Sequence, residues 1–192
     1  MHTQHSWQTL AEKGWFRSAV LALGLAASGL AQAVPDDILG YWRVIDDRTG
    51  FAKAIAFFNK NADGYYVGRI MSTIPRPDYT PITVCQKCPP PYTNRKVIGM
   101  PVAWFKANPT AIEGKTWEYT QGHALDPIQG RIYQGKAKIS PDRRRLTMRG
   151  YLGVSLLGRT QTWIREDAGS PLLKNLPSVE EAEKEQVELP KF

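Results

Sequence analysis

Histidine is scarce in this chain, and the sequence motifs of the common enzyme classes are missing. The 192 residues contain three histidines: His2 and His5 lie near the start, and only His123 lies further along. No Gly-x-Ser-x-Gly, His-Glu-x-x-His or phosphate-loop motif occurs. Proton transfer by histidine would therefore depend on His123, with Asp126 as its acidic neighbour. The sequence predicts no catalytic residues and no cofactor.

Long hydrophobic runs are missing as well. The most apolar stretch, 18–30, has 13 residues and follows Lys13 and Arg17, whereas a membrane-spanning helix needs about 20. The stretch ends at Ala31-Gln32-Ala33, a small-x-small pattern that signal peptidase cuts. We therefore expect a signal peptide over 1–33, with a membrane anchor as the alternative. After cleavage near Ala33 the chain would be soluble, without a transmembrane segment, and periplasmic or secreted.

Negative charge is sparse in the body of the chain. Residues 34–177 carry a formal net charge of +9, and the segment from Ser178 onward carries −3. A basic surface suits an acidic ligand, an anionic lipid or nucleic acid, and export argues against nucleic acid as a partner. We expect either a small amphipathic or anionic ligand, or a protein partner in the cell envelope.

Cysteine is limited to one pair, Cys85 and Cys88, in a Cys-x-x-Cys arrangement. In an exported protein a disulfide is the default. A redox-active pair would need a helix N-terminus to lower a thiol pKa, and the three prolines at 89–91 argue against a helix there. Zinc needs about four ligands, and the sequence does not supply them. We expect a local disulfide and no metal site.

Short runs rich in aromatic and β-branched residues alternate with turn signals along the body. This pattern predicts an all-β domain of about eight short antiparallel strands, either a barrel or a sandwich, and glycines within the strands favour a small barrel. Along 65–74, alternation places Arg69 on one face with Val67 and Met71, and Ile70 on the other. The expected strands are 39–46, 52–58, 65–74, 100–105, 115–123, 131–139, 145–153 and 159–166.

Two segments interrupt this rhythm. The proline-rich stretch 75–99 is long for a loop, which is typical of functional or disordered segments. After Glu166, the capping-box pattern Ser178-Val179-Glu180-Glu181 predicts a short helix to about Leu189. Its apolar positions are sparse, so we expect a solvated tail. The expected organisation is a signal peptide (1–33), a barrel domain (34–166) and a C-terminal tail (167–192).

The two ends of the barrel sequence carry matching signals. Gly40-Tyr41-Trp42 opens the first strand, and Trp163-Ile164-Arg165 ends the last. Closing a barrel pairs its first and last strands, which would bring Arg165 onto the indole face of Trp42, a contact worth roughly 0.5–2 kcal/mol. We therefore assign Gly40, Trp42 and Arg165 a structural role in closing the barrel.

A Gly-x-Trp motif followed by an arginine in the last strand resembles the calycin group of lipocalins, fatty-acid-binding proteins and avidin-like barrels. Further motifs over 39–165 are similar to a narrower family of exported bacterial proteins, domain of unknown function family 2147. The resemblance implies a lipocalin-like barrel and a periplasmic or secreted location, but no activity, because none is established for the family. The triple proline and the acidic tail depart from the family pattern. The motifs are Gly40-Tyr41-Trp42 with Thr49-Gly50, Asp63-Gly64 with Gly68-Arg69-Ile70, Cys85-x-x-Cys88, Asp126-Pro127-x-x-Gly130 with Tyr133, Arg149-Gly150-Tyr151-Leu152-Gly153, and Leu157-Gly158-Arg159-Thr160-Gln161-Thr162-Trp163.

Three functions remain open. The first is binding of one small, anionic and partly apolar ligand, such as a fatty acid, in the barrel mouth; its alternative is a filled interior with outward-facing arginines. The second is an envelope interaction module that uses the basic face, the proline-rich loop and the tail. The third, with least support, is an enzyme built on the cysteine pair or on His123 and Asp126. The candidate ligand-binding residues are Arg69, Trp117, Arg149, Tyr151, Arg159, Gln161 and Trp163.

Overall fold

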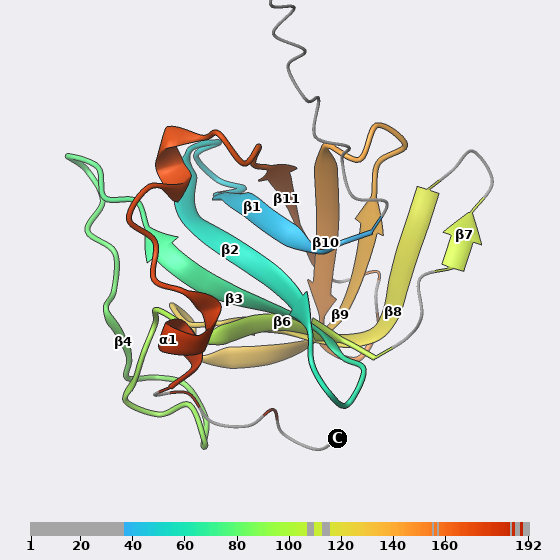
Figure 1. Ribbon diagram of the computed structural model, residues 1–192. Helices are drawn as coiled ribbons and strands as arrows, with labels where there is room; N and C mark the ends of the chain where they lie inside the picture. Colours follow the sequence, from blue (N-terminus) through green and yellow to red (C-terminus); the bar gives the residue numbers. More distant parts are fainter. Residues whose placement is uncertain are drawn as a thin grey trace, which may run out of the picture. The chain divides into compact units, whose positions relative to one another are not determined.

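The computed structural model describes residues 37–106, 110–112, 116–154, 156, 158–184, 186 and 189 (Figure 1). The expected signal peptide lies outside this part of the chain, and its cleavage stays a prediction. Among the described residues, no helix is long and apolar enough to cross a membrane.

Eight antiparallel strands close into a barrel, as the sequence predicts. The order around it is β6, β3, β2, β1, β11, β10, β9 and β8, and pairing of β6 with β8 completes the ring. The largest difference from the expected bounds is in β8, which continues three residues further, to Asp126. The strands are β1 (Gly40–Ile45), β2 (Ala52–Lys60), β3 (Tyr66–Thr73), β6 (Pro101–Phe105), β8 (Thr116–Asp126), β9 (Arg131–Ile139), β10 (Arg145–Tyr151) and β11 (Arg159–Arg165).

Shorter elements lie around this barrel. β4 (Val84–Cys85) and β5 (Arg95–Lys96) form a two-stranded sheet within the proline-rich segment, and β7 (Thr110–Ile112) extends the edge of β8. The C-terminal tail holds a 3₁₀ turn, Pro171–Leu173, and helix α1 (Val179–Glu183). Elements of two or three residues are too short to carry a periodic pattern, so the sequence did not predict these strands.

Aromatic side chains fill one end of the barrel, which we call the closed end. Phe58, Phe105, Tyr66 and Tyr119 are buried together there. A Cβ atom at Gly68 would lie 2.5 Å from the ring of Phe58, so glycine at this position makes room for that ring. At this end the interior is filled by side chains, as one of the sequence-based alternatives expects.

The segment before β1 plugs the closed end. Ile38 is fully buried; its amide donates a hydrogen bond to the Tyr119 hydroxyl (2.9 Å), and its carbonyl accepts one from Trp42 Nε1 (2.8 Å). The guanidinium of Arg165 donates to the carbonyls of Leu39 (2.6 Å) and Arg143 (2.8 Å). The bonds to Ile38 and Leu39 tie the first and last strands to the plug, and the bond to Arg143 ties the last strand to the β9–β10 turn.

The C-terminal tail packs against the barrel, contrary to the expected solvated tail. Figure 1 shows α1 beside β2 and β3, and Ala182 of α1 is buried against Ile55 and Met71. Glu183 Oε1 lies 2.7 Å from Arg69 Nε. Leu173, Leu176 and Val179 of the tail also pack on this apolar outer face, and covering it removes that surface from water.

Candidate ligand site at the open end of the barrel

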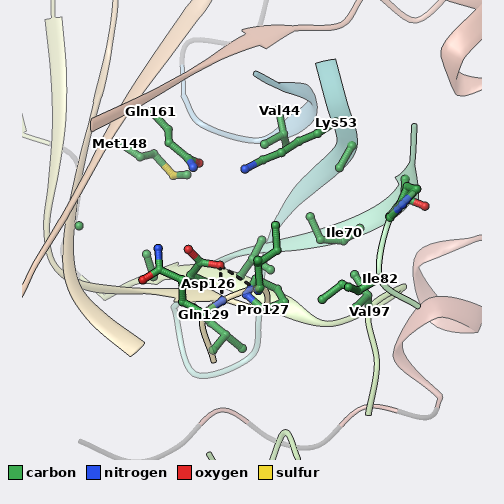
Figure 2. A pocket seen from close by; sticks show the side chains of 18 of the residues that line it. Val44, Lys53, Ile70, Ile82, Val97, Asp126, Pro127, Gln129, Met148 and Gln161 are labelled. Atoms are coloured by element: carbon green, nitrogen blue, oxygen red, sulfur yellow. Dashed lines mark hydrogen bonds between the residues drawn. The ribbon is translucent and has the colours of Figure 1, made fainter. Parts of the chain in front are cut away.

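A cavity of about 150 Å³ lies at the end of the barrel opposite the aromatic filling, which we call the open end (Figure 2). A cavity of about this volume in another protein holds one benzene molecule, so the space matches a ligand the size of a single ring. Its strand-borne apolar walls come from inward-facing side chains that alternate along the strands. These are Val44, Ala54, Ile70, Val102, Met148 and Trp163.

The proline-rich segment 75–99 forms a wall of this cavity. Tyr79, Pro81, Ile82 and Val97 line it. The segment has no extended run of apolar residues. Its Val97 nevertheless packs into the main apolar cluster of the barrel.

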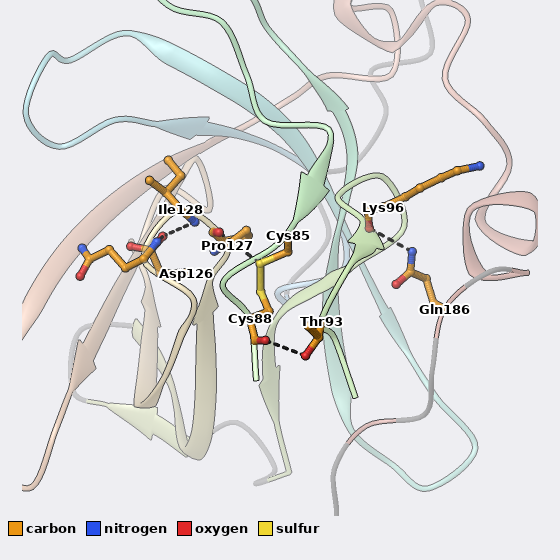
Figure 3. Close-up of a disulfide and its surroundings, with 9 residues drawn as sticks. Cys85, Cys88, Thr93, Lys96, Asp126, Pro127, Ile128 and Gln186 are labelled. Carbon is orange, nitrogen blue, oxygen red and sulfur yellow. Dashed lines mark hydrogen bonds between the residues drawn. A yellow bond between two sulfur atoms is a disulfide. The ribbon is translucent and has the colours of Figure 1, made fainter. Parts of the chain in front are cut away.

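The predicted disulfide between Cys85 and Cys88 is present and crosslinks two positions within this segment (Figure 3). Both cysteines are buried with Tyr92 and Trp104 in a cluster on the outer side of the sheet. A Cβ atom at Gly130 would lie 2.0 Å from the Lys87 carbonyl oxygen, so glycine lets the β8–β9 turn approach the disulfide loop closely. A buried pair of this kind, away from any helix N-terminus, is the arrangement of a structural crosslink.

Polar side chains surround the opening. Figure 2 shows Lys53 and Gln161 pointing toward one another from opposite walls, with Asp126 and Gln129 on another side of the cavity. The Asp126 carboxylate accepts hydrogen bonds from the amides of Ile128 (2.9 Å) and Gln129 (3.1 Å), which fixes the β8–β9 turn. An apolar interior with a few polar groups at its mouth is the usual composition of a small-molecule site.

A β-bulge aims Lys53 into the cavity. Val44 pairs with Ala54 and Ile45 pairs with Ala52, so Lys53 is the extra residue between two paired positions of β2. A bulge of this kind redirects a side chain relative to strict alternation. Alternation alone would place Lys53 on the outer face, and for this reason the sequence analysis missed it.

The cations at the opening have carboxylate neighbours. Arg159 forms a forked ion pair with Asp47, and its hydrogen bonds hold the pKa of the Asp47 carboxyl below its ordinary value. Lys53 Nζ lies 3.7 Å from Asp46 Oδ2, which is an ion pair but exceeds hydrogen-bond distance. An anionic ligand would therefore compete with Asp47 for Arg159, whereas Lys53 keeps hydrogen-bonding capacity.

Three of the seven candidate ligand-binding residues line the cavity: Arg159, Gln161 and Trp163. Trp117 lies in β8, and its side chain is outside the part that the structure describes.

The structure does not bring the other three candidates to the cavity. Arg69, Arg149 and Tyr151 occupy positions that alternate with inward-facing residues of β3 and β10, so they face outward. Arg149 donates instead to Thr160 Oγ1 (2.8 Å) and to the Leu156 carbonyl (2.9 Å).

His123 and Asp126 are not brought together. His123 stacks on Trp104, with ring centroids 5.7 Å apart, whereas Asp126 lines the cavity. Burial lowers the pKa of His123, which favours the neutral ring. Within the described ranges, no group of three or more His, Cys, Asp and Glu side chains is placed to hold a metal ion.

Comparison with known families agrees with this architecture. The family model DUF2147, described as an uncharacterized protein conserved in bacteria, matches residues 40–165. The chain belongs to this family. The match runs from the first barrel strand to the last, so it covers the barrel of this DUF2147 protein and leaves out the C-terminal tail.

A solved structure has a similar fold. Protein HP1028 from Helicobacter pylori, described as belonging to the lipocalin family, superposes with a TM-score of 0.53. The two are 17% identical, and the alignment covers 69% of this chain and 84% of HP1028. At this identity the likeness shows a lipocalin-like fold alone. No curated protein matches the sequence of this DUF2147 protein.

Proposed function

We propose that this protein binds a small, largely apolar molecule in the open end of the barrel, with the ligand's polar group at the rim beside Lys53 and Gln161. The observation that carries the proposal is the apolar cavity of about 150 Å³ above a floor that includes Trp163. Barrels of about eight strands are wide enough to hold one small ligand.

The size of the cavity limits the ligand. Aromatic side chains occupy the closed end, so a long hydrocarbon chain cannot lie along the full barrel axis. Only a ring or a short chain, about the size of benzene, can be buried completely. A long-chain fatty acid would leave much of its chain outside the opening.

The rim favours a ligand with a hydrogen-bond acceptor. Lysine has three N–H donors, and the nearest carboxylate oxygen, on Asp46, is 3.7 Å from Nζ. Gln161 adds amide donors on the facing wall, while its Oε1 accepts from Trp163 Nε1 at 3.4 Å. A short carboxylic acid or an alcohol matches this combination of an apolar body and an acceptor head.

The first experiment is native mass spectrometry of the protein purified gently from its own host. A reproducible extra mass that is lost on denaturation would identify the bound molecule and support the proposal. The mass of the denatured chain also tests cleavage after Ala33. If the native mass equals that of the chain alone, the binding experiment with a cavity-filling variant decides whether the cavity accepts a ligand.

A cavity-filling variant tests the site directly. Ala124 lines the cavity and Ala168 is exposed outside it, so Ala124→Leu and Ala168→Leu make the same chemical change in the two places. Titration calorimetry with hexanoate and 1-hexanol should show binding to the wild type and to Ala168→Leu, and at least about tenfold weaker binding to Ala124→Leu. Absence of binding to the wild type, or equal binding to both variants, would refute the proposal.

A further inference from the structure

Exposed large apolar side chains are concentrated at the open end of the barrel. The strands alternate in direction, so the described residues of the loops 46–51, 74–100, 127–130 and 152–158 all lie at this end. Among the described residues, six of the seven exposed large apolar side chains belong to these loops, and the seventh, Leu172, lies in the tail. The six are Phe51, Ile82, Ile128, Leu152, Val154 and Leu156.

The β10–β11 loop is the most apolar of the four. Leu152, Val154 and Leu156 fall within five residues and are 54%, 60% and 86% exposed. The loop leaves β10 next to Gly150 and enters β11 at Arg159, both of which line the cavity. These aliphatic side chains therefore stand beside the cavity opening.

Positive charge accompanies the apolar side chains. Arg48, in the β1–β2 loop, and Arg131, at the start of β9, are exposed at this end, and so is Lys87 beside the β8–β9 turn. The guanidinium carbon of Arg76 lies 4.5 Å from the ring centroid of Phe51. The body of the chain is strongly basic as a whole, so its field attracts anionic surfaces.

We propose that the open end docks on an anionic lipid bilayer, with the β10–β11 loop inserted at the level of the headgroups. The apolar side chains lie on separate loops around an opening, so their partner must accept several spaced side chains and supply negative charge. The interface of an anionic bilayer does both, since apolar side chains enter it and basic side chains stay at the headgroups. Docking in this orientation would place the cavity opening at the membrane surface.

Co-sedimentation with sucrose-loaded vesicles tests the proposal. The wild type should sediment with vesicles of equimolar phosphatidylglycerol and phosphatidylcholine, and less with pure phosphatidylcholine or at high salt. Replacing Leu152, Val154 and Leu156 by serine should weaken sedimentation at least about tenfold, because each side chain loses its apolar transfer energy. The control, Leu172→Ser, changes an exposed leucine in the tail and should sediment like the wild type.

Circular dichroism and thermal melting establish that the triple variant folds, which is expected because its three side chains are exposed. A wild type that stays in the supernatant, a triple variant that sediments normally, or a Leu172→Ser variant that sediments as poorly as the triple variant would each overturn the proposal. If the same three serines abolish self-association measured by light scattering while vesicle binding is absent, the surface is a protein contact instead. Vesicle binding is measured without added ligand. A negative result would therefore refute membrane docking without bearing on whether the cavity binds a small molecule.

Discussion

Arg165 and Trp42 face each other across the seam that closes the barrel. They are directly paired in the β1–β11 register, and the guanidinium carbon lies 4.2 Å from the centroid of the indole ring. Arg165 is only 5% exposed. Burial lowers its pKa from the ordinary value, and the carbonyls of Leu39 and Arg143 and the indole face surround its charge.

We expect Arg165→Lys to destabilise the protein by about 1–3 kcal/mol, because an ammonium cannot reach both carbonyls and stack on the ring at once. Urea unfolding measures the loss. Arg144→Lys is the matched control, since Arg144 forms an exposed ion pair with Asp167, and it should change stability by less than about 0.5 kcal/mol. Equal losses of stability in the two variants would show that the Arg165 contacts stabilise the protein no more than an exposed ion pair does.

The strands could be predicted from the sequence, because the alternation of apolar residues within a strand and the turn residues between strands are local signals. Every barrel strand was predicted, and the pairing of the first strand with the last follows from barrel closure. Which face of β3 points inward was not predictable from β3 itself. Val67 and Met71, on the outer face with Arg69, are as apolar as Ile70 inside, because the disulfide loop covers Val67 and the tail covers Met71.

The candidate site was predicted only in part for the same reason. Arg159, Gln161 and Trp163 were named as candidates and line the cavity, since all three lie on β11. Lys53 was missed because a bulge turns it inward. Val97 was missed because its place in the cavity depends on how the whole segment 75–99 folds back, which no local pattern encodes.

Replacing Asp47 should change which ligands the cavity accepts. Asp47→Asn removes the charge that engages Arg159, and the freed guanidinium then attracts an anion at the cavity mouth. We expect the affinity for hexanoate to rise relative to 1-hexanol, as measured by titration calorimetry. Asp78→Asn is the control, because Asp78 pairs with Arg76 and does not line the cavity. An unchanged preference in Asp47→Asn would show that Arg159 does not contact the ligand.

The disulfide should stabilise the protein modestly. It closes a four-residue loop, for which chain entropy predicts about 2 kcal/mol. The Cys85→Ala/Cys88→Ala variant should lose about that amount in urea unfolding, plus a smaller packing loss next to Tyr92. Urea unfolding of the wild type in a reducing agent measures the contribution of the crosslink alone, because reduction breaks the disulfide but leaves both cysteine side chains in place. Stability that is unaffected by reduction would show that only packing matters.

Acid should destabilise the protein first through His123. Burial lowers its folded pKa, whereas the unfolded chain binds a proton near the ordinary value of about 6.5. The unfolded state therefore binds more protons just below that pH, and the free energy of unfolding falls as the pH drops from about 6.5 to the folded pKa. The lowered pKa values of Asp46 and Asp47 act separately, in a window below about 3.8.

Urea unfolding at pH 7.5 and pH 5 measures the effect of His123. The wild type should be less stable at pH 5, and His123→Gln should lose most of that difference. The same decline in His123→Gln would assign the acid sensitivity to another group.

Contact between the tail and the barrel depends on Gly99. Its φ is +81°, and an added Cβ would lie 1.8 Å from the Ala182 carbonyl oxygen in α1. Gly64 has nearly the same φ, +83°, with nothing within 4 Å of an added Cβ. Gly64→Ala therefore carries only the backbone cost of about 1–2 kcal/mol, and Gly99→Ala carries that cost and also displaces α1.

We expect Gly99→Ala to be the less stable variant and to expose the tail. Amide hydrogen exchange in 178–184 should rise in Gly99→Ala and stay at the wild-type rate in Gly64→Ala. The outer face of β2 and β3 is apolar where Ala182 covers it, so displacement of α1 would also increase binding of a hydrophobic dye. Equal exchange in the two variants would mean that α1 contributes little to covering this face, and the tail would then be the solvated segment that its sequence predicts.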